Sequence, residues 1–289
     1  MFKRMILSLA ILIVFMATTT RPVFAAKNAN SLQIKGSDTM VNLVQAWAEG
    51  FMAKEPSIFL AVTGGGSGTG ITALMNGTCD IAASSRRITP KEIELAAKKG
   101  FKPEEYRVAL DGLAVVVNKG NPISKLTIDE LADIFTGRVT NWKELGGEDS
   151  KIVILSREVN SGTHVYFKEH VVKKGDPKSK EEFSADALLL PSSQAIADEV
   201  LQNPSAIGYY GMGYIGKDHQ AVSVAKDKAS ETVFPTIENV ISGQYPISRP
   251  LFLYTRGVAE GNAKKFLDFV LSTPGQQLVS TVGFVPVQK

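Results

Sequence analysis

The chain has 289 residues, with 32 basic and 29 acidic side chains, three histidines and one cysteine. This near balance of charge excludes a protein that binds nucleic acid or a membrane surface through a basic face. The single Cys79 excludes an intrachain disulfide, and the scattered histidines exclude a sequence-local metal cluster, so no metal or other cofactor is expected.

The N-terminus has the pattern of a secretory signal peptide. Lys3 and Arg4 precede an apolar stretch over 6–17, and residues 23–25 offer small side chains where a signal peptidase reads them. The apolar stretch is shorter than the roughly 20 residues of a transmembrane helix. We expect residues 1–25 to be removed, leaving equal numbers of basic and acidic residues and a soluble periplasmic protein. A retained membrane anchor is the alternative.

The first half of the chain predicts strands that alternate with helices. Helical spacing of apolar residues follows the first two strands, and a proline opens a later amphipathic helix. Cys79 is expected to be a small buried residue of the third strand. The predicted strands are 31–35, 58–63 and 79–83, and the predicted helices begin at about 40 and 71 and span 90–99. This alternation is typical of a mostly parallel sheet.

The second half continues the pattern and ends in two helices. Its predicted strands are 110–118, 151–155, 206–210 and 250–255, and its predicted helices are 128–135, about 163–172, 262–271 and 275–282. Residues 173–182 read as a charged surface loop. No repeat or long linker is present, which predicts an α/β protein of two lobes that share crossing strands. We expect one lobe to contain 26–112 and 234–289, and the other to contain 113–233.

Three short turns rich in Gly, Ser and Thr each follow a predicted strand and precede a predicted helix. They are Gly36–Thr39, Gly64–Gly70 and Arg157–Thr163. Such turns present hydroxyls and free backbone N–H groups at a helix N-terminus, where the helix dipole favours an anion. One turn alone could be an ordinary helix cap. Three turns together predict a site that surrounds an oxyanion.

The glycine-rich turn does not match the common nucleotide motifs. A P-loop requires Lys followed by Ser or Thr after its last glycine, whereas Gly70 is followed by Ile71 and Thr72. A dinucleotide fingerprint would need an acidic ribose ligand further along, which is missing. A backbone nest with Ser67 as a hydroxyl donor remains, and a plain tight turn is the alternative.

Arg157 is the expected charge partner of the anion. Its planar guanidinium can hold two oxygens of a tetrahedral anion, and the Ser161–Thr163 helix start follows closely. A surface ion pair with Glu158 is the alternative. Arg86 is expected to pair with an acidic residue at the surface, and a contact with the anion is the alternative. A catalytic pair of Ser161 and His164 is not expected, because no acid is placed to orient the histidine.

Four segments together resemble the periplasmic phosphate-binding proteins of bacterial phosphate ABC importers, especially their short subgroup. The segments are Lys35–Met40, Gly64–Gly70, Asp80–Arg86 and Arg157–Thr163, and the resemblance runs from about Ser31 to Pro286. It implies a type II periplasmic-binding-protein fold, in which two α/β lobes close on the ligand.

The resemblance also implies the ligand residues. Those expected to contact phosphate are Ser37, Asp38, Thr39, Ser67, Ser85, Arg157, Ser161, Gly162 and Thr163. Ser85 stands where well-known members carry an aspartate that accepts the phosphate proton. Asp38 is the nearest acidic residue to replace it, and an acid there would favour protonated phosphate over sulfate.

The predicted function is therefore capture of inorganic phosphate by a monomer that delivers it to a membrane permease. Capture of another oxyanion, such as sulfate, molybdate or tungstate, is the alternative within the same fold. An exported phosphohydrolase would need a metal cluster or an activated nucleophile, and neither is visible in the sequence. A protein that reports phosphate to a signalling complex is a third alternative.

Overall fold

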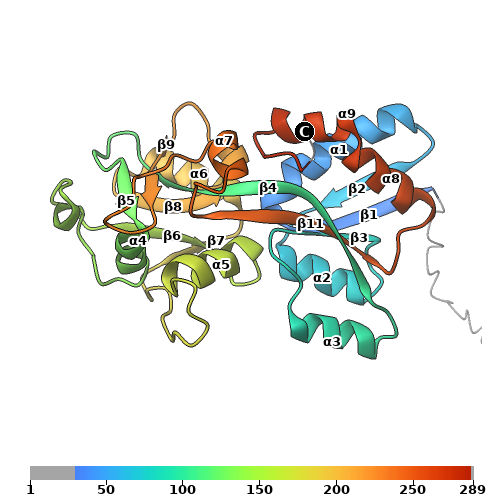
Figure 1. Cartoon of the computed structure of the whole chain (residues 1–289), viewed down its shortest axis with the longest axis horizontal. Coiled ribbons are helices and arrows are strands. Elements are labelled where there is room, and N and C mark those ends of the chain that lie inside the picture. The colour runs from blue at the N-terminus through green and yellow to red at the C-terminus, as the bar shows by residue number, and fades with distance from the viewer. Residues whose placement is uncertain (1–29, 288–289) are drawn as a thin grey trace, which may run out of the picture.

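The computed structural model describes residues 30–287, so the predicted signal peptide and its cleavage site lie outside the described residues. Two α/β lobes lie side by side, and two long strands run between them (Figure 1). These crossing strands are β4 (Pro103–Val117) and β11 (Ser248–Arg256).

The first lobe combines the N-terminal elements with the two C-terminal helices (Figure 1). In chain order these are β1 (Ser31–Gly36), η1 (Asp38–Met40), α1 (Val41–Lys54), β2 (Phe59–Thr63), α2 (Ser67–Met75), β3 (Ile81–Ser84), α3 (Pro90–Lys98), α8 (Gly261–Leu271) and α9 (Thr273–Thr281).

The second lobe is formed by the middle of the chain (Figure 1). Its elements are β5 (Lys125–Thr127), α4 (Ile128–Phe135), η2 (Trp142–Leu145), β6 (Val153–Arg157), α5 (Gly162–Phe167), the π-helical η3 (Lys168–Val172), β7 (Leu188–Leu190), α6 (Ser193–Gln202), β8 (Ala206–Gly211), η4 (Met212–Tyr214), β9 (Gln220–Ala221), β10 (Ser223–Ala225) and α7 (Ile237–Ile241).

A mixed sheet passes through both lobes. Within residues 30–287, nine strands join it in the order β2-β1-β3-β11-β4-β8-β6-β7, with β9 beside β4, while β10 and β5 form a separate pair. β1 pairs in parallel with β2 and β3, and β6 pairs in parallel with β7 and β8. Helical crossovers connect parallel strands, which explains the strand–helix alternation in the sequence.

The strand β4 changes partners along its length. Its first part, through Gly112, pairs with β11, and its last part, from Leu113, pairs with β8. Leu113 to Val117 are all fully buried, as expected for a strand covered on both faces. The two lobes are therefore joined by continuous strands. The residue boundaries of the lobes given above stay a prediction.

Local signals explain where several helices start. Thr89 and Thr127 each accept the N–H of a glutamate three residues later, and that glutamate caps in return, so α3 and α4 both begin with a capping box. Trp47 and Phe51 of α1 are buried in the core, and the Phe51 ring packs against Phe266 and Phe269 of α8. The N- and C-terminal elements thus share one core.

Some sequence-based boundaries are wrong by two residues or more. The strand predicted at 79–83 is β3 at Ile81–Ser84, so Cys79 is buried as expected but lies just before the strand. The strand predicted at 151–155 is β6 at Val153–Arg157, which makes Arg157 its last residue. Helix α6 was missed altogether. None of the helices within 30–287 combines the length and apolarity needed to cross a bilayer.

Candidate anion-binding site

The three predicted turns meet where the two lobes face each other. The first lobe contributes Ser37 to Thr39 around η1, Ser67 at the start of α2 and Ser85 just after β3. The second lobe contributes Arg157 at the end of β6 and Ser161 to Thr163 at the start of α5. Most of these side chains are almost fully buried, which is unusual for Ser, Thr and Arg.

Glycines determine the shape of the turn before α2. Gly65 and Gly66 have φ of +108° and +97°, a region that favours glycine. A Cβ on Gly70 would clash with the carbonyl oxygen of Lys35, so this glycine lets α2 pack directly on β1. The turn therefore directs the N-terminus of α2, with Ser67 fully buried, toward the second lobe.

Gly162 brings the start of α5 against two serines of the first lobe. A Cβ at Gly162 would lie 2.7 Å from Ser85 Oγ and would clash with Ser67 Oγ. Ser67 Oγ and Ser85 Oγ are 3.3 Å apart, and the Ser85 N–H donates to Ser67 Oγ at 3.0 Å. Only a residue without a side chain fits between them at this separation.

A pair of threonine hydroxyls also joins the lobes. Thr39 Oγ1 and Thr163 Oγ1 are 2.6 Å apart, and both side chains are buried. Ser161 caps α5 because its Oγ accepts the N–H groups of Thr163 and His164 at 3.2 and 3.4 Å. The helix start is thereby fixed in contact with the first lobe.

Arg157 is 1% exposed and pairs with Asp38 across the lobes rather than with Glu158. Its Nη1 lies 3.2 Å from Asp38 Oδ2 and donates to Ser193 Oγ, while Nη2 donates to the carbonyl of Pro191. Burial lowers the pKa of Arg157 and the neighbouring Asp38 opposes this shift. The guanidinium stays charged, because arginine does not deprotonate in proteins.

Two buried polar atoms of the site lack a hydrogen-bond partner among residues 30–287. They are Ser37 Oγ and Arg157 Nε. A buried donor without a partner costs about 1–3 kcal/mol, so proteins rarely keep one without a reason. Both atoms are donors that an anion can satisfy.

Asn160 forms a bridge between the lobes that the sequence analysis did not single out. Its side-chain Nδ2 donates to the carbonyl of Gly65 at 3.0 Å and to Thr69 Oγ1 at 3.3 Å. Its own carbonyl accepts the N–H of Gly68 at 3.0 Å. Asn160 lies within the predicted Arg157–Thr163 turn, but its contacts depend on the position of the other lobe.

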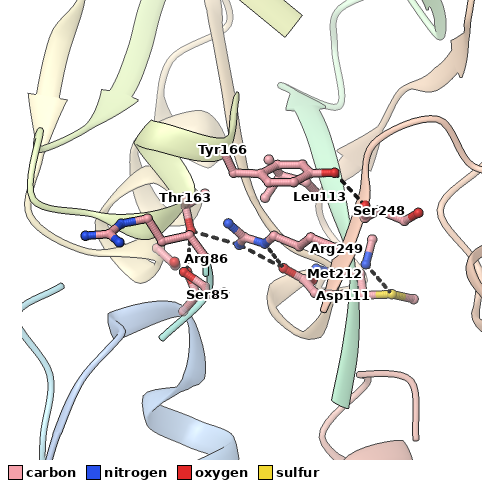
Figure 2. Close-up of polar contacts among 12 residues, drawn as sticks. Ser85, Arg86, Asp111, Leu113, Thr163, Tyr166, Met212, Ser248 and Arg249 are labelled. Carbon is pink, nitrogen blue, oxygen red and sulfur yellow. Dashed lines mark hydrogen bonds and ion pairs between the residues drawn. The ribbon is translucent and has the colours of Figure 1, made fainter. Parts of the chain in front are cut away.

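The crossing strands contribute a buried ion pair that no sequence pattern predicted. Arg249 Nε and Nη2 both donate to Asp111 Oδ2, at 3.0 and 2.9 Å, and Nη2 donates to Thr163 Oγ1 at 2.9 Å (Figure 2). Burial raises the pKa of Asp111, although Arg249 opposes that shift. The two residues are 138 positions apart, so no local pattern could join them.

His164 is not placed to activate Ser161. Its ring nitrogen Nδ1 lies 3.3 Å from Ser156 Oγ, which also contacts the hydroxyl of Tyr209 at 2.7 Å. Burial lowers the pKa of His164, which favours the neutral ring. Among residues 30–287, no group of three or more His, Cys, Asp or Glu side chains could hold a metal ion.

Arg86 pairs with an acidic residue, as expected, but not at the open surface. Its two terminal nitrogens bind both oxygens of Glu92 at 2.7 and 2.8 Å, and the Arg86 side chain is only 12% exposed. This bidentate pair fixes the loop between β3 and α3, beside Ser85.

Three comparisons place this chain among known proteins. A family model described as the PBP superfamily domain matches residues 24–274. The phosphate-binding protein PstS of Bacillus subtilis is 35% identical, over 90% of this chain and 82% of its own length. A putative phosphate ABC transporter substrate-binding protein from Clostridium perfringens, solved with bound phosphate, is 34% identical, with a TM-score of 0.80 over 90% of this chain and 100% of its own.

Proposed function

The chain belongs to the PBP superfamily, and from this membership we propose that it captures inorganic phosphate between its lobes and delivers it to an ABC importer. The alignments with the similar proteins named for phosphate binding cover most of this chain and most of each relative. This extent supports the same activity for the whole chain. The chain acts as a binding protein rather than an enzyme.

The observation that carries the proposal is the convergence of buried donors from both lobes. Arg157, the start of α2 and the start of α5 face one another, and Ser37 Oγ and Arg157 Nε are buried donors without a partner within the described residues. Helix N-termini and a guanidinium are the groups that bind tetrahedral oxyanions most effectively. A dry, closed site strengthens each of these hydrogen bonds.

Each predicted site residue has a role in this proposal. Arg157 supplies the counter-charge, the hydroxyls and backbone N–H groups donate to phosphate oxygens, Gly162 allows close approach of the lobes, and Asp38 accepts the phosphate proton. The proposed ligand set is Ser37, Asp38, Thr39, Ser67, Ser85, Arg157, Ser161, Gly162 and Thr163.

Closure of the lobes completes this ligand set. Ser67 and Ser85 belong to the first lobe, whereas Arg157 and Thr163 belong to the second, so an open molecule would hold only half of the donors. Differential binding to the closed state is what shifts a two-state equilibrium. We propose that phosphate binds the closed state more tightly than the open one and so favours closure of the lobes.

The cellular setting is part of the same proposal. The chain is exported, loses residues 1–25, works as a soluble monomer in the periplasm and docks on the membrane permease of the importer. We take the predicted lobes, 26–112 with 234–289 and 113–233, as the two halves that move in this cycle, with α7 (Ile237–Ile241) counted in the second lobe.

Calorimetric titration of the purified mature chain with phosphate, sulfate, arsenate and molybdate tests the function. The expected result is tight one-to-one binding of phosphate and arsenate, which are both protonated near neutral pH, and weak binding of sulfate and molybdate. Tightest binding of sulfate, molybdate or tungstate would assign the chain to another oxyanion. Sustained hydrolysis of a phosphomonoester, lost in Ser161→Ala, would overturn the binding-protein assignment.

A further inference from the structure

An ion pair lies on the two strands that connect the lobes. Asp111 of β4 and Arg249 of β11 are directly paired in the antiparallel register, and their side chains are 0% and 1% exposed. Both nitrogens on one edge of the guanidinium bind the same carboxylate oxygen, Asp111 Oδ2. The pair is therefore held by the part of the fold that belongs to both lobes.

The same ion pair contacts elements of the second lobe. Asp111 Oδ1 accepts the backbone N–H of Met212 at 3.0 Å, and Arg249 Nη2 donates to Thr163 Oγ1 at 2.9 Å. The guanidinium lies 5.5 Å from the centre of the Tyr166 ring. Figure 2 shows Arg249 between Asp111 and helix α5, which carries Thr163 and Tyr166.

The contact with Arg249 restricts where the Thr163 hydroxyl proton can point. Because a guanidinium has donors and no acceptor, Thr163 Oγ1 can only accept from it. The hydroxyl proton of Thr163 must then point elsewhere, toward Thr39 Oγ1 at 2.6 Å or toward an anion in the site. A hydroxyl that accepts from a charged donor also becomes a stronger donor itself.

Stability alone does not explain this arrangement. Desolvation of two buried charges offsets most of their attraction, and an apolar pair of similar volume is often at least as stable. Arg249 also keeps Nη1 without a hydrogen-bond partner within 30–287, which adds to its cost. A role in geometry accounts for a buried pair that is directed at a site residue.

We propose that Arg249, held by Asp111, is a positioning residue for phosphate binding that acts by orienting the Thr163 hydroxyl as a donor. This inference rests on the proposed function. It adds two residues of the connecting strands to the binding machinery, and it makes the Thr163 hydroxyl a donor toward the site when the lobes are closed.

A double-mutant cycle on the full mature chain tests the inference. Phosphate dissociation constants are measured by calorimetry for wild type, Arg249→Lys, Thr163→Val and the double variant. Lysine keeps the charge but cannot bind Asp111 and Thr163 with one planar fork. Arg107→Lys on β4 is the matched control, since Arg107 is exposed and lies four residues from Asp111 in the same strand.

The expected result is strong coupling between the two positions. Each single variant weakens phosphate binding about tenfold, the scale of one charged hydrogen bond, and the double variant binds within about twofold of Thr163→Val. Arg107→Lys binds as wild type does. Asp111→Asn, an isosteric change, is the second variant if Arg249→Lys does not fold, and its effect should also vanish in the Thr163→Val background.

Results that contradict the positioning role differ from results that contradict the proposed function. Multiplicative effects of Arg249→Lys and Thr163→Val, or wild-type affinity in Arg249→Lys, would overturn the positioning role while leaving phosphate binding intact. A wild-type chain that does not bind phosphate would overturn the proposed function, and this inference with it. Melting temperatures of all variants separate a loss of affinity from a loss of folded protein.

Discussion

Asp38 Oδ2 lies 3.2 Å from Arg157 Nη1 and accepts the backbone N–H of Ser193 at 2.8 Å. One carboxylate oxygen thus connects the first lobe to the end of β6 and the start of α6. Both contacts use Oδ2, so Oδ1 of Asp38 is the atom that we expect to meet a protonated phosphate oxygen.

We predict that Arg157→Ala weakens phosphate binding by about 2–5 kcal/mol, because it leaves a buried anion without its main counter-charge. Calorimetric titration measures the change. Arg138→Ala is the matched control, since Arg138 belongs to the same lobe and is 45% exposed in a surface ion pair. Equal affinities of the Arg157 and Arg138 variants would show that Arg157 is not a ligand.

Asp38→Asn is expected to shift selectivity. The amide keeps the size of the side chain but donates hydrogen bonds, so it can meet an unprotonated sulfate oxygen. Competition titrations at about pH 7 should show weaker phosphate binding and stronger sulfate binding. Asp149→Asn, an exposed acid of the second lobe, is the control. Unchanged rejection of sulfate would mean that another group accepts the phosphate proton.

Gly162→Ala is expected to keep the lobes from closing fully. The added methyl group would clash with Ser67 Oγ and lie 2.7 Å from Ser85 Oγ, and both serines belong to the opposite lobe. Phosphate binding should weaken by about 1–3 kcal/mol, the usual cost of overpacking, while the melting temperature of the phosphate-free protein hardly changes. Gly120→Ala, in an exposed turn of the second lobe, is the control and should leave phosphate affinity unchanged. A variant with normal affinity would argue against this closed geometry.

Asn160→Ala should shorten the lifetime of the phosphate complex. It removes the side-chain donor to Gly65 and Thr69 across the lobes but keeps the backbone bond to Gly68. Two lost hydrogen bonds predict about 1–2 kcal/mol, expressed mainly in the dissociation rate. Stopped-flow release of phosphate measures it, with Asn76→Ala in the first lobe as control. A wild-type release rate would exclude Asn160 as a bridge that holds the closed state.

Stability should depend on pH through His164. Burial lowers its pKa below the ordinary value of 6.5, so the unfolded chain binds a proton at a higher pH than the native chain does. The stabilisation is complete above about pH 6.5 and is lost as the pH falls, by about 1.4 kcal/mol for each unit of pKa difference. Urea unfolding between about pH 7 and 5 should therefore show a shallower loss in His164→Asn than in wild type. An equal slope in both proteins would contradict this, and the exposed His170→Asn serves as control.

The sequence identified the parts of the candidate site that are local. The Ser and Thr turns and Arg157 each follow a strand and precede a helix, and this order is visible along the chain. Their meeting between two lobes was expected from the family resemblance, and their ligand roles stay predictions. The α/β class follows from the alternation of strands and helices, because parallel strands need crossovers.

What the sequence did not reveal depends on pairing between distant segments. Asp111 and Arg249 are neighbours only because β4 and β11 pair in one register. Ser193 and Pro191 reach Arg157 because α6 starts beside β6, and α6 itself was missed. Strand ends were also misjudged, since Cys79 is as apolar as the residues from Ile81 to Ala83, and this composition does not mark where pairing begins.

The position of β11 determines the order in which the molecule can be assembled. This strand lies between β3 and β4 in the sheet, yet it comes after the whole second lobe in the chain. Until residues 248–256 have been synthesised, the edges of β3 and β4 that pair with β11 remain open, and such open edges can pair with other chains. Contacts between segments so far apart in sequence also form slowly. The lobe that is synthesised first is therefore completed last.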